Sequence, residues 1–216
     1  MALLEILLPP ACAGCGAYGR LFCEACHRLL QPLSRGQDHF SAPDAGMVLG
    51  DALLLAHAAF AHAGPMRRAL QRLKYGGAAR LANPLARAAA PALLHLLDVA
   101  GPAVLVPVPV HPARLRQRGY NQAALLAGAL AAEARLPLSD LLIRTRATTR
   151  QHGLTRAARL HNLRGAFAVR RGRRIPDSVI LIDDILTTAA TLESCAVVLR
   201  SAGVTSVFGL AIAREV

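Results

Sequence analysis

Two adjacent carboxylates, Asp183 and Asp184, are the side chains best placed to do chemistry. They directly follow residues 179–182, an apolar run typical of a strand buried on both faces of a parallel sheet. A short Thr/Ala segment and a helical pattern at 192–199 come next. Ligands of open α/β sheets bind outside the carboxyl ends of strands, where a helix N-terminus attracts phosphate. We therefore expect a phosphate site with two acids beside it for sugar hydroxyls; the plainer alternative is a strand that ends in two helix-capping acids.

A second reactive group consists of the cysteines in a C-x2-C-x7-C-x2-C pattern, Cys12, Cys15, Cys23 and Cys26. Two C-x-x-C knuckles predict a tetrahedral zinc site. Four thiolates leave no position for water, so we expect a structural metal that stabilises a segment too short to bury its own core. Disulfide pairing is the alternative, and a reducing cytosol disfavours it.

The stretch V-I-L-I-D-D-I-L-T-T-A-A-T at 179–191 resembles the 13-residue signature of phosphoribosyltransferases. The resemblance implies that Asp183 and Asp184 bind the ribose hydroxyls of phosphoribosyl pyrophosphate (PRPP). The loop that wraps its 5′-phosphate would then consist of Ile185, Leu186, Thr187, Thr188, Ala189, Ala190 and Thr191. Ala189 stands where the family usually has Gly, and an alanine with left-handed backbone costs roughly 1–2 kcal/mol.

The composition predicts a partner that carries phosphate. The 216 residues include 25 Lys+Arg and 13 Asp+Glu, which gives a formal charge of +12 and a pI of about 11.0. A small phosphorylated ligand, nucleic acid or both would fit, and so would a basic bias that only aids solubility. We expect no transmembrane segment, because no run of 18 apolar residues is free of charge or proline. The N-terminus is a poor signal peptide, so we expect a cytoplasmic protein.

The periodicity predicts an α/β domain at 51–216, after the cysteine module at 1–32 and a linker at 33–50. Strand patterns lie at 104–110, 141–146, 179–184 and 205–212, with a further one at 166–169. Helical patterns lie at 65–74, 80–97, 121–134 and 192–199. This alternation favours a mostly parallel sheet with helices on both faces. Residues 52–60 fit either a strand or the start of a helix.

Residues 73–77, L-K-Y-G-G, resemble the Lys-Gly loop that contacts pyrophosphate in some phosphoribosyltransferases. The resemblance adds Lys74 to the expected PRPP site. A glycine that ends a helix after a basic last turn accounts for the same residues equally well.

Four motifs in a fixed order make the family resemblance specific. After the cysteine knuckles and L-K-Y-G-G come V-P-V-P-V-H-P-x-R-L-R-x-R-G-Y-N-Q and R-x-T-x2-Q-x2-L-T-R-x2-R-x2-N-L-x-G-A-F, which leads to the phosphate loop. Together they resemble the ComF family of competence-associated proteins. The resemblance implies an N-terminal zinc ribbon on a type I phosphoribosyltransferase-like α/β fold, a cytoplasmic location, and a role in the uptake or processing of transforming DNA.

The leading interpretation is a PRPP-binding, ComF-like protein that supports DNA uptake and natural transformation. If it is an enzyme, it displaces pyrophosphate from the ribose and transfers the pentosyl group to an acceptor that the sequence does not identify. Mg²⁺ would bridge pyrophosphate and the ribose hydroxyls, because hard oxygen ligands suit it. Arg156 and Arg159 are the first choices for stabilising the departing diphosphate.

Two other interpretations remain open at this stage. In one, the protein is a non-catalytic module that binds nucleic acid, such as single-stranded DNA, through Arg-rich segments at 114–118, 144–150 and 170–174. Three tyrosines and no tryptophan give it little to stack on bases. In the other, the protein is a scaffold, and Ala189 marks a phosphoribosyl site that has decayed.

Overall fold

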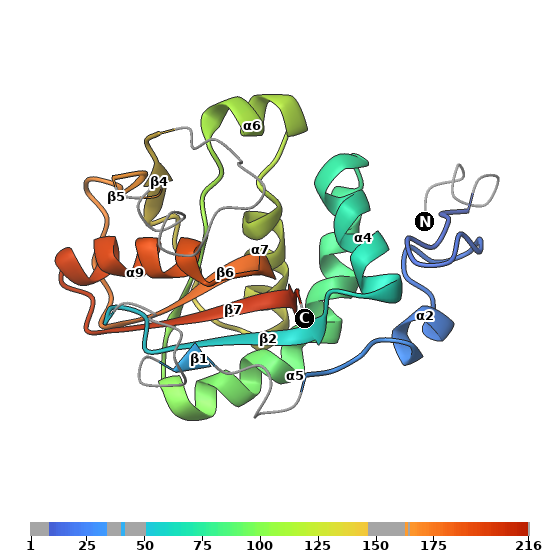
Figure 1. The fold of residues 1–216 in the computed structure, drawn as a ribbon, viewed down its shortest axis with the longest axis horizontal. Helices are drawn as coiled ribbons and strands as arrows, with labels where there is room; N and C mark the ends of the chain where they lie inside the picture. Colours follow the sequence, from blue (N-terminus) through green and yellow to red (C-terminus); the bar gives the residue numbers. More distant parts are fainter. Residues whose placement is uncertain (1–8, 34–39, 42–50, 147–162, 164, 216) are drawn as a thin grey trace.

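The computed structural model describes residues 9–33, 40–41, 51–146, 163 and 165–215. Its main sheet has five strands in the order β1-β2-β7-β6-β3 (Figure 1). The strands are β1 (Phe40–Ser41), β2 (Leu55–Ala61), β3 (Val104–Pro107), β6 (Ser178–Leu186) and β7 (Ser206–Arg214). β1 is antiparallel to β2, and the other three pairings are parallel. The expected mostly parallel sheet is therefore confirmed.

Strand β6 lies between two parallel neighbours. Ile182 is opposite Pro107 of β3 on one side and opposite Leu210 of β7 on the other. The apolar run that precedes the acids is buried along its whole length, which explains why it has no alternating polar residues. This is the position that the phosphoribosyltransferase signature implies for its strand.

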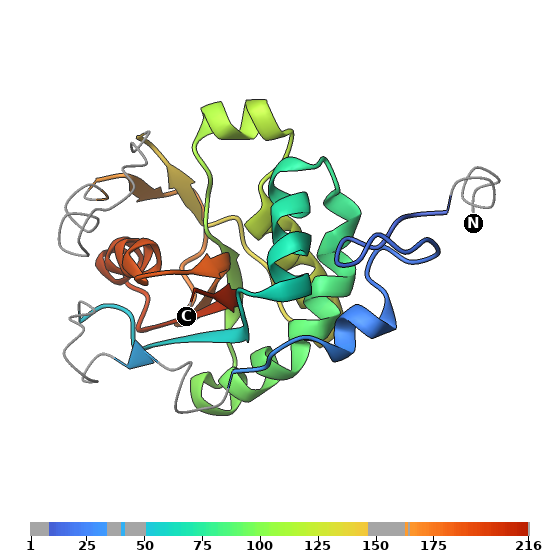
Figure 2. The ribbon, with the colours of Figure 1, turned by 45° about the vertical axis from the view of Figure 1, so that its right-hand side comes forward.

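Helices cover both faces of the sheet, as expected. Helix α9 (Ala190–Ser201) packs on one face, while α5 (Ala82–Ala100) and α7 (Gln122–Ala134) pack on the other, with α4 (Gly64–Tyr75) beside them (Figure 2). A β-carbon at Gly209 of β7 would lie 2.8 Å from Leu192 Cδ1, so this glycine lets α9 approach the sheet closely. Helix α5 runs through Pro91 and follows a short 3-10 turn, η1 (Ala79–Leu81).

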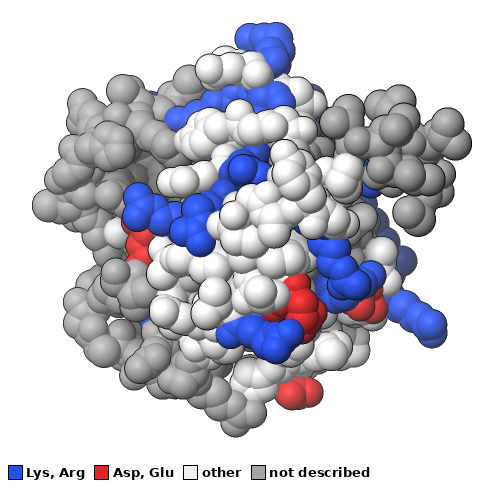
Figure 3. Space-filling view, turned by 90° about the vertical axis from the view of Figure 1, so that its right-hand side faces the viewer, with Lys and Arg blue, Asp and Glu red and all other residues white. Residues whose placement is uncertain are grey.

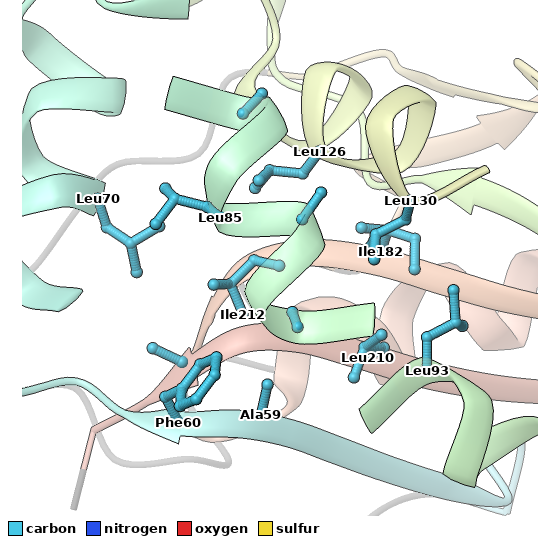
Figure 4. Close-up of a cluster of buried hydrophobic side chains, with 14 of the residues drawn as sticks. Ala59, Phe60, Leu70, Leu85, Leu93, Leu126, Leu130, Ile182, Leu210 and Ile212 are labelled. Carbon is cyan, nitrogen blue, oxygen red and sulfur yellow. The ribbon is translucent and has the colours of Figure 1, made fainter. Parts of the chain in front are cut away.

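The larger apolar core lies between the sheet and the helices of this second face (Figure 4). Leucines at helical spacing supply its upper layer, and β-strand residues supply the lower one. The side chains that meet there include Phe60, Leu70, Leu85, Leu93, Leu126, Leu130, Ile182, Leu210 and Ile212. The helical patterns at 65–74, 80–97 and 121–134 are thus confirmed as core-facing helices, to within a few residues at their ends.

Residues 141–146 contain the predicted strand, but its predicted place in the main sheet was wrong. Strand β4 (Leu142–Arg144) lies outside the main sheet and pairs in antiparallel orientation with β5 (Phe167–Val169). The segment just before β4, at residues 137–139, lies along the free edge of β3 instead. There Leu105 N donates to Pro137 O and Ser139 N donates to Leu105 O, both at 2.9 Å. The remaining place in the sheet belongs to β2, from the segment 52–60 whose type the sequence left open.

Proline limits β3 to four residues, in agreement with the expectation of a short strand at 104–110. The chain then forms α6 (Pro112–Arg118), a helix that the sequence analysis did not predict. His111 Nδ1 accepts from Ala113 N at 3.2 Å and caps this helix. Gly119, with φ of 83°, ends it.

The cysteine module contains the short helix α2 (Glu24–Arg28) and lies beside α4 (Figures 1 and 2). The chain that leaves the module runs beside β2, because Leu33 N donates to Ala59 O and Ala61 N donates to Gln31 O. Within the segment 33–50, expected as a linker, Phe40–Ser41 form strand β1, and most of the rest lies outside the described residues. No helix in the described part of the chain has both the length and the apolar character needed to cross a membrane.

Candidate functional site

The two acids occupy consecutive positions near the carboxyl end of β6. Side chains alternate along a strand, so the carboxylates of Asp183 and Asp184 leave the backbone toward opposite faces of the sheet. Asp184 is buried and Asp183 is half-buried. The amide N–H of Asp184 donates to Asp183 Oδ1 at 2.8 Å. The structure therefore places both acids where open α/β sheets bind their ligands.

Lys74 reaches the acids from the last turn of α4. Its Nζ lies 2.7 Å from Asp184 Oδ2, and the two side chains are only 11% and 6% exposed. Each charge offsets the desolvation of the other, so removing either one would leave an uncompensated buried charge. The structure thus brings together three residues that the sequence analysis assigned to the PRPP site from separate motifs.

Burial raises the pKa of Asp183 to about 8, and the neighbouring charge of Asp184 acts in the same direction. The amide of Asp184 and the ammonium of Lys74 favour the ionised form but do not offset these effects. Two carboxylates on consecutive residues still repel each other, so they ionise together only at a cost in free energy. The site without ligand therefore holds a proton near neutral pH, in a place suited to hydroxyl groups or a cation.

The phosphate loop is short in the structure. Strand β6 includes Ile185 and the buried Leu186, and α9 begins at Ala190, so three residues connect them. Thr187 is exposed, and Thr188 and Thr191 are half-buried. The loop and the first turn of α9 therefore offer hydroxyls and a helix N-terminus at the same edge of the sheet as the acids.

Ala189 has left-handed backbone, with φ of 55° and ψ of 0°. It occupies the N-cap of α9, where its side chain cannot accept a hydrogen bond from the helix, and it is 3% exposed. The positive φ explains why a glycine suits this position, and it costs an alanine roughly 1–2 kcal/mol. The loop is strained at the residue that departs from the family pattern.

The last turn of α4 is held from a second side. Tyr120 Oη donates to Leu73 O at 2.6 Å, and the guanidinium of Arg118 lies 5.2 Å from the centre of the Tyr75 ring. Burial raises the pKa of Tyr120, which keeps its hydroxyl a donor. The motif R-G-Y-N-Q therefore supports the turn that carries Lys74, a connection that the sequence did not reveal.

Glu193, in the first turn of α9, is a site-positioning residue that sequence reasoning missed. It is 3% exposed, and its carboxylate accepts from Ala52 N at 3.3 Å and Leu53 N at 3.1 Å. These bonds tie the helix that follows the phosphate loop to the start of β2. The only available signal was a lone acid in an otherwise apolar helical pattern.

His62 lies just after β2. Its Nδ1 is 4.0 Å from Glu215 Oε1, and burial lowers its pKa, so it is neutral near pH 7. Arg156 and Arg159, expected to stabilise a departing diphosphate, lie outside the described residues.

The four cysteines form a compact cluster whose ligand atoms all lie within 4.8 Å of one another. Cys12 Sγ is 3.7 Å from Cys26 Sγ, and Cys15 Sγ is 3.6 Å from Cys23 Sγ. A tetrahedron with Zn–S bonds of about 2.3 Å has edges of about 3.8 Å. The cluster therefore fits a structural metal such as zinc.

The surroundings of Cys12 favour a thiolate, whereas burial and the neighbouring thiols raise the pKa of Cys26. Burial opposes ionisation of Cys12, but Gly14 N and Cys23 N both donate to its Sγ at 3.3 Å and help lower its pKa to about 6. A β-carbon at Gly14 would lie 2.5 Å from Cys26 Sγ, so only glycine leaves room for the cluster. Cys195, the fifth cysteine, is buried in α9, where burial raises its thiol pKa.

Comparison with known proteins gives relatives that agree with the family resemblance of the motifs. Competence protein F of Haemophilus influenzae is 38% identical over 115 residues, covering 51% of this chain and 50% of that protein. The DNA utilization protein YhgH of Escherichia coli K12 is 31% identical over 153 residues, covering 68% and 66%. YhgH of Salmonella typhi is 30% identical over 150 residues, covering 66% and 64%. The chain thus matches half to about two thirds of the length of these relatives.

No family model matches the chain. Among solved structures, a hypoxanthine phosphoribosyltransferase from Staphylococcus aureus has a TM-score of 0.34 at 16% identity, covering 60% of this chain and 61% of the other. That likeness is too weak to support an argument, so the fold rests on the sheet order and the acid-bearing strand β6 described above. With relatives named for competence and DNA utilization, and with the four-cysteine module that its motifs predict, the chain belongs to the ComF family.

Proposed function

We propose that this protein binds PRPP at the carboxyl end of β6. We also propose that it acts in the cytoplasm, where it supports the uptake of DNA. One observation carries the ligand assignment: Lys74 lies 2.7 Å from Asp184 at the edge of the sheet where the phosphate loop begins. An ammonium, two carboxylates and a helix N-terminus together match the groups of a phosphorylated ribose that also carries pyrophosphate.

Each group has a distinct part in this proposal. Asp183 and Asp184 accept from the ribose hydroxyls, and the loop at 187–191 holds the 5′-phosphate through its hydroxyls and amides. When ligand binds, the ammonium of Lys74 leaves Asp184 and pairs with the pyrophosphate. The carboxylate oxygens suit Mg²⁺, which supplies charge neutralisation for the pyrophosphate when bound. We assign Arg156 and Arg159 to the diphosphate, and any pentosyl transfer depends on them and on an acceptor.

Zinc is the metal that we propose for the cysteine module, in a structural role. Four sulfur ligands at tetrahedral spacing select a soft or borderline cation, and all four positions belong to the protein. The domain limits expected from the sequence, with the module at 1–32 and the phosphoribosyl domain at 51–216, belong to the same proposal.

Calorimetric titration of the full chain with PRPP and Mg²⁺ tests the ligand assignment. Ribose 5-phosphate and pyrophosphate, titrated separately, are the matched controls, because each presents only part of the ligand. We expect PRPP to bind more tightly than either. If PRPP binds no better than pyrophosphate, the acids have no role in ligand recognition and the proposal fails.

A second candidate, DNA binding, is favoured by the exposed turn at 170–174 between β5 and β6, which carries four arginines. Arg170 is paired with Asp140 Oδ2 at 2.9 Å, so three of these charges are available for phosphates without competition from that acid. Arg144, from another Arg-rich segment, is half-buried over the Phe167 ring at 5.3 Å and is poorly placed to follow a strand. The face that holds α4 and the cysteine module also exposes more Lys and Arg than acid (Figure 3).

A further inference from the structure

Helix α4 contacts the cysteine module and the ribose acids through neighbouring turns. Arg68 Nε donates to Gly14 O, and Arg72 Nη1 donates to Cys12 O at 3.4 Å. These arginines are four positions apart and therefore lie on one face of the helix. Lys74, two residues further on, holds Asp184. A single rigid element thus connects the carbonyls of a metal-binding knuckle to the acids on β6, as the views of α4 between the two parts show (Figures 1 and 2).

The contact between α4 and the module has an open side and a closed side. On the open side lies a groove of about 850 Å³ bordered by Gly14, Cys15, Arg68, Arg72 and Tyr75. On its closed side, Cys12, Phe22 and Cys26 share an apolar cluster with Met66 and Leu70. The two guanidinium contacts and this apolar packing together hold α4 to the module.

Both kinds of contact require the knuckle to keep its shape. Small four-cysteine modules fold only when a metal holds the thiolates together, and the accepting carbonyls belong to Cys12 and Gly14, at and next to the ligands. A divalent metal with four thiolates has a formal charge of −2, which the two arginines match with +2. A bound metal would therefore fix the positions of the Cys12 and Gly14 carbonyls, and its negative thiolate complex would attract the two arginines of α4.

We propose that metal loading of the cysteine module docks α4 through Arg68 and Arg72, and thereby holds Lys74 in place at the ribose acids. The docking itself is independent of the ligand, whereas its effect on affinity rests on the proposed PRPP function. Tyr120 supports the same turn from the other side, through Leu73 O. Loss of metal consequently weakens the site without abolishing it.

Hydrogen exchange on the ligand-free full chain tests the docking. Metal-loaded protein is compared with protein from which the metal has been removed by a chelator. We expect amides of α4 to lose protection by about tenfold or more, together with those of the module, while α9 keeps its protection as the internal reference. Unchanged protection in α4, with the module alone opened, would overturn the proposal.

Three single substitutions on one helix test the link to the ligand. Arg68→Met and Arg72→Met remove the contacts to the module, and Arg67→Met removes an equal charge from an exposed position next to them. With one equivalent of metal retained in each, we expect the first two to weaken PRPP binding by about twofold to tenfold and Arg67→Met to change it less.

The outcomes separate this proposal from the one on which it rests. Equal loss of affinity in all three variants would show that only net charge matters and would overturn the coupling. If the wild-type protein does not bind PRPP, the proposed function fails, but the exchange experiment still decides whether metal docks α4. A variant that fails to fold is replaced by the exchange comparison on wild-type protein, which needs no substitution.

Discussion

At the scale of single residues, the pairing of Lys74 with Asp184 determines what the site can bind. The ammonium compensates one buried carboxylate, while its neighbour Asp183 carries a raised pKa. A ligand that supplies both hydroxyl donors and a phosphate acceptor satisfies all three groups at once.

Replacing Asp183 or Asp184 by Ala should weaken PRPP binding by about tenfold to a hundredfold. Hydrogen bonds to charged groups contribute roughly 1.5–3 kcal/mol, and each substitution removes one charged acceptor. Calorimetry with Mg²⁺ present measures the change. Asp98→Ala is the control, because Asp98 is 78% exposed near the end of α5, with its Oδ2 3.5 Å from His95 Nδ1. Equal effects at Asp98 and Asp184 would remove the acids from the proposed site.

Ala189→Gly should relieve the strain in the phosphate loop. Glycine adopts a φ of 55° without the steric cost that alanine has, so we expect unfolding free energy or phosphate affinity to rise by up to about 1 kcal/mol. Urea unfolding and PRPP titration measure the two effects. Ala190→Gly is the matched control, because it introduces glycine one residue later, within the helix, and should destabilise the protein by about 0.5–1 kcal/mol. Equal changes from the two substitutions would contradict strain at Ala189.

Asp183 should make stability depend on pH. Its pKa is about 8 in the folded protein and near the model-compound value of 3.8 when unfolded. Between these values the folded state holds a proton that the unfolded state has released, so this residue makes stability fall as pH rises through the window. Above about pH 8 its contribution is constant. Urea unfolding of wild type and Asp183→Asn at several pH values measures this, and the variant should lack that part of the slope. Parallel curves would show that the carboxyl is ionised throughout.

At the scale of elements, the site depends on how two helices meet one strand. Helix α9 is fixed at its first turn by Glu193, through the amides of Ala52 and Leu53. Helix α4 is fixed at its last turn by Tyr120. In both cases the bonded partners lie far apart in the sequence. Tertiary contacts, rather than the local motifs, therefore position the loop at 187–191 and Lys74.

The turn between β5 and β6 should carry part of any DNA affinity. Replacing Arg170, Arg171, Arg173 and Arg174 together by Gln should flatten the dependence of log affinity on log salt for single-stranded DNA by about 2, since the three arginines other than the Asp140-paired Arg170 each contribute about 0.7. The corresponding Lys variant keeps the charges and should keep the slope. A slope that stays the same in the Gln variant would exclude this turn as a DNA contact.

At the scale of the whole molecule, the cysteine module and the α/β domain share one apolar cluster. Phe22, Cys26 and Leu30 belong to the same buried group as Leu70 and Leu85. The module is therefore packed against the domain, so we expect the loss of a bound metal to affect more than the first thirty residues. This differs from a separate ribbon joined by a flexible connection.

Purified without chelators, the protein should contain one equivalent of zinc by elemental analysis. Cys26→Ser should lose the metal and lower the melting temperature by about 4–10 °C, because the shared core opens. Cys195→Ala is the control, since this buried cysteine lies in α9, far from the cluster, and should keep full metal content. Less than about a tenth of an equivalent in the wild type would contradict the assignment.

The sequence by itself determined the parts of this protein that depend on local spacing. The two C-x-x-C knuckles predict a metal cluster because four thiolates at that spacing can converge. The run at 179–184 predicts a buried strand followed by two acids, because a strand buried on both faces is a nearly continuous apolar run. Helices at 65–74, 80–97 and 121–134 follow from apolar periodicity, and the α/β class follows from the alternation of these elements.

Only the tertiary structure decided which distant groups meet. It brought Lys74 to Asp184, Tyr120 to Leu73 and Arg72 to Cys12, and no spacing in the sequence contains these pairs. It also gave β2 the place in the sheet that residues 141–146 were expected to take. Short apolar segments fit several neighbours equally well, and the choice among them depends on the packing of the whole core.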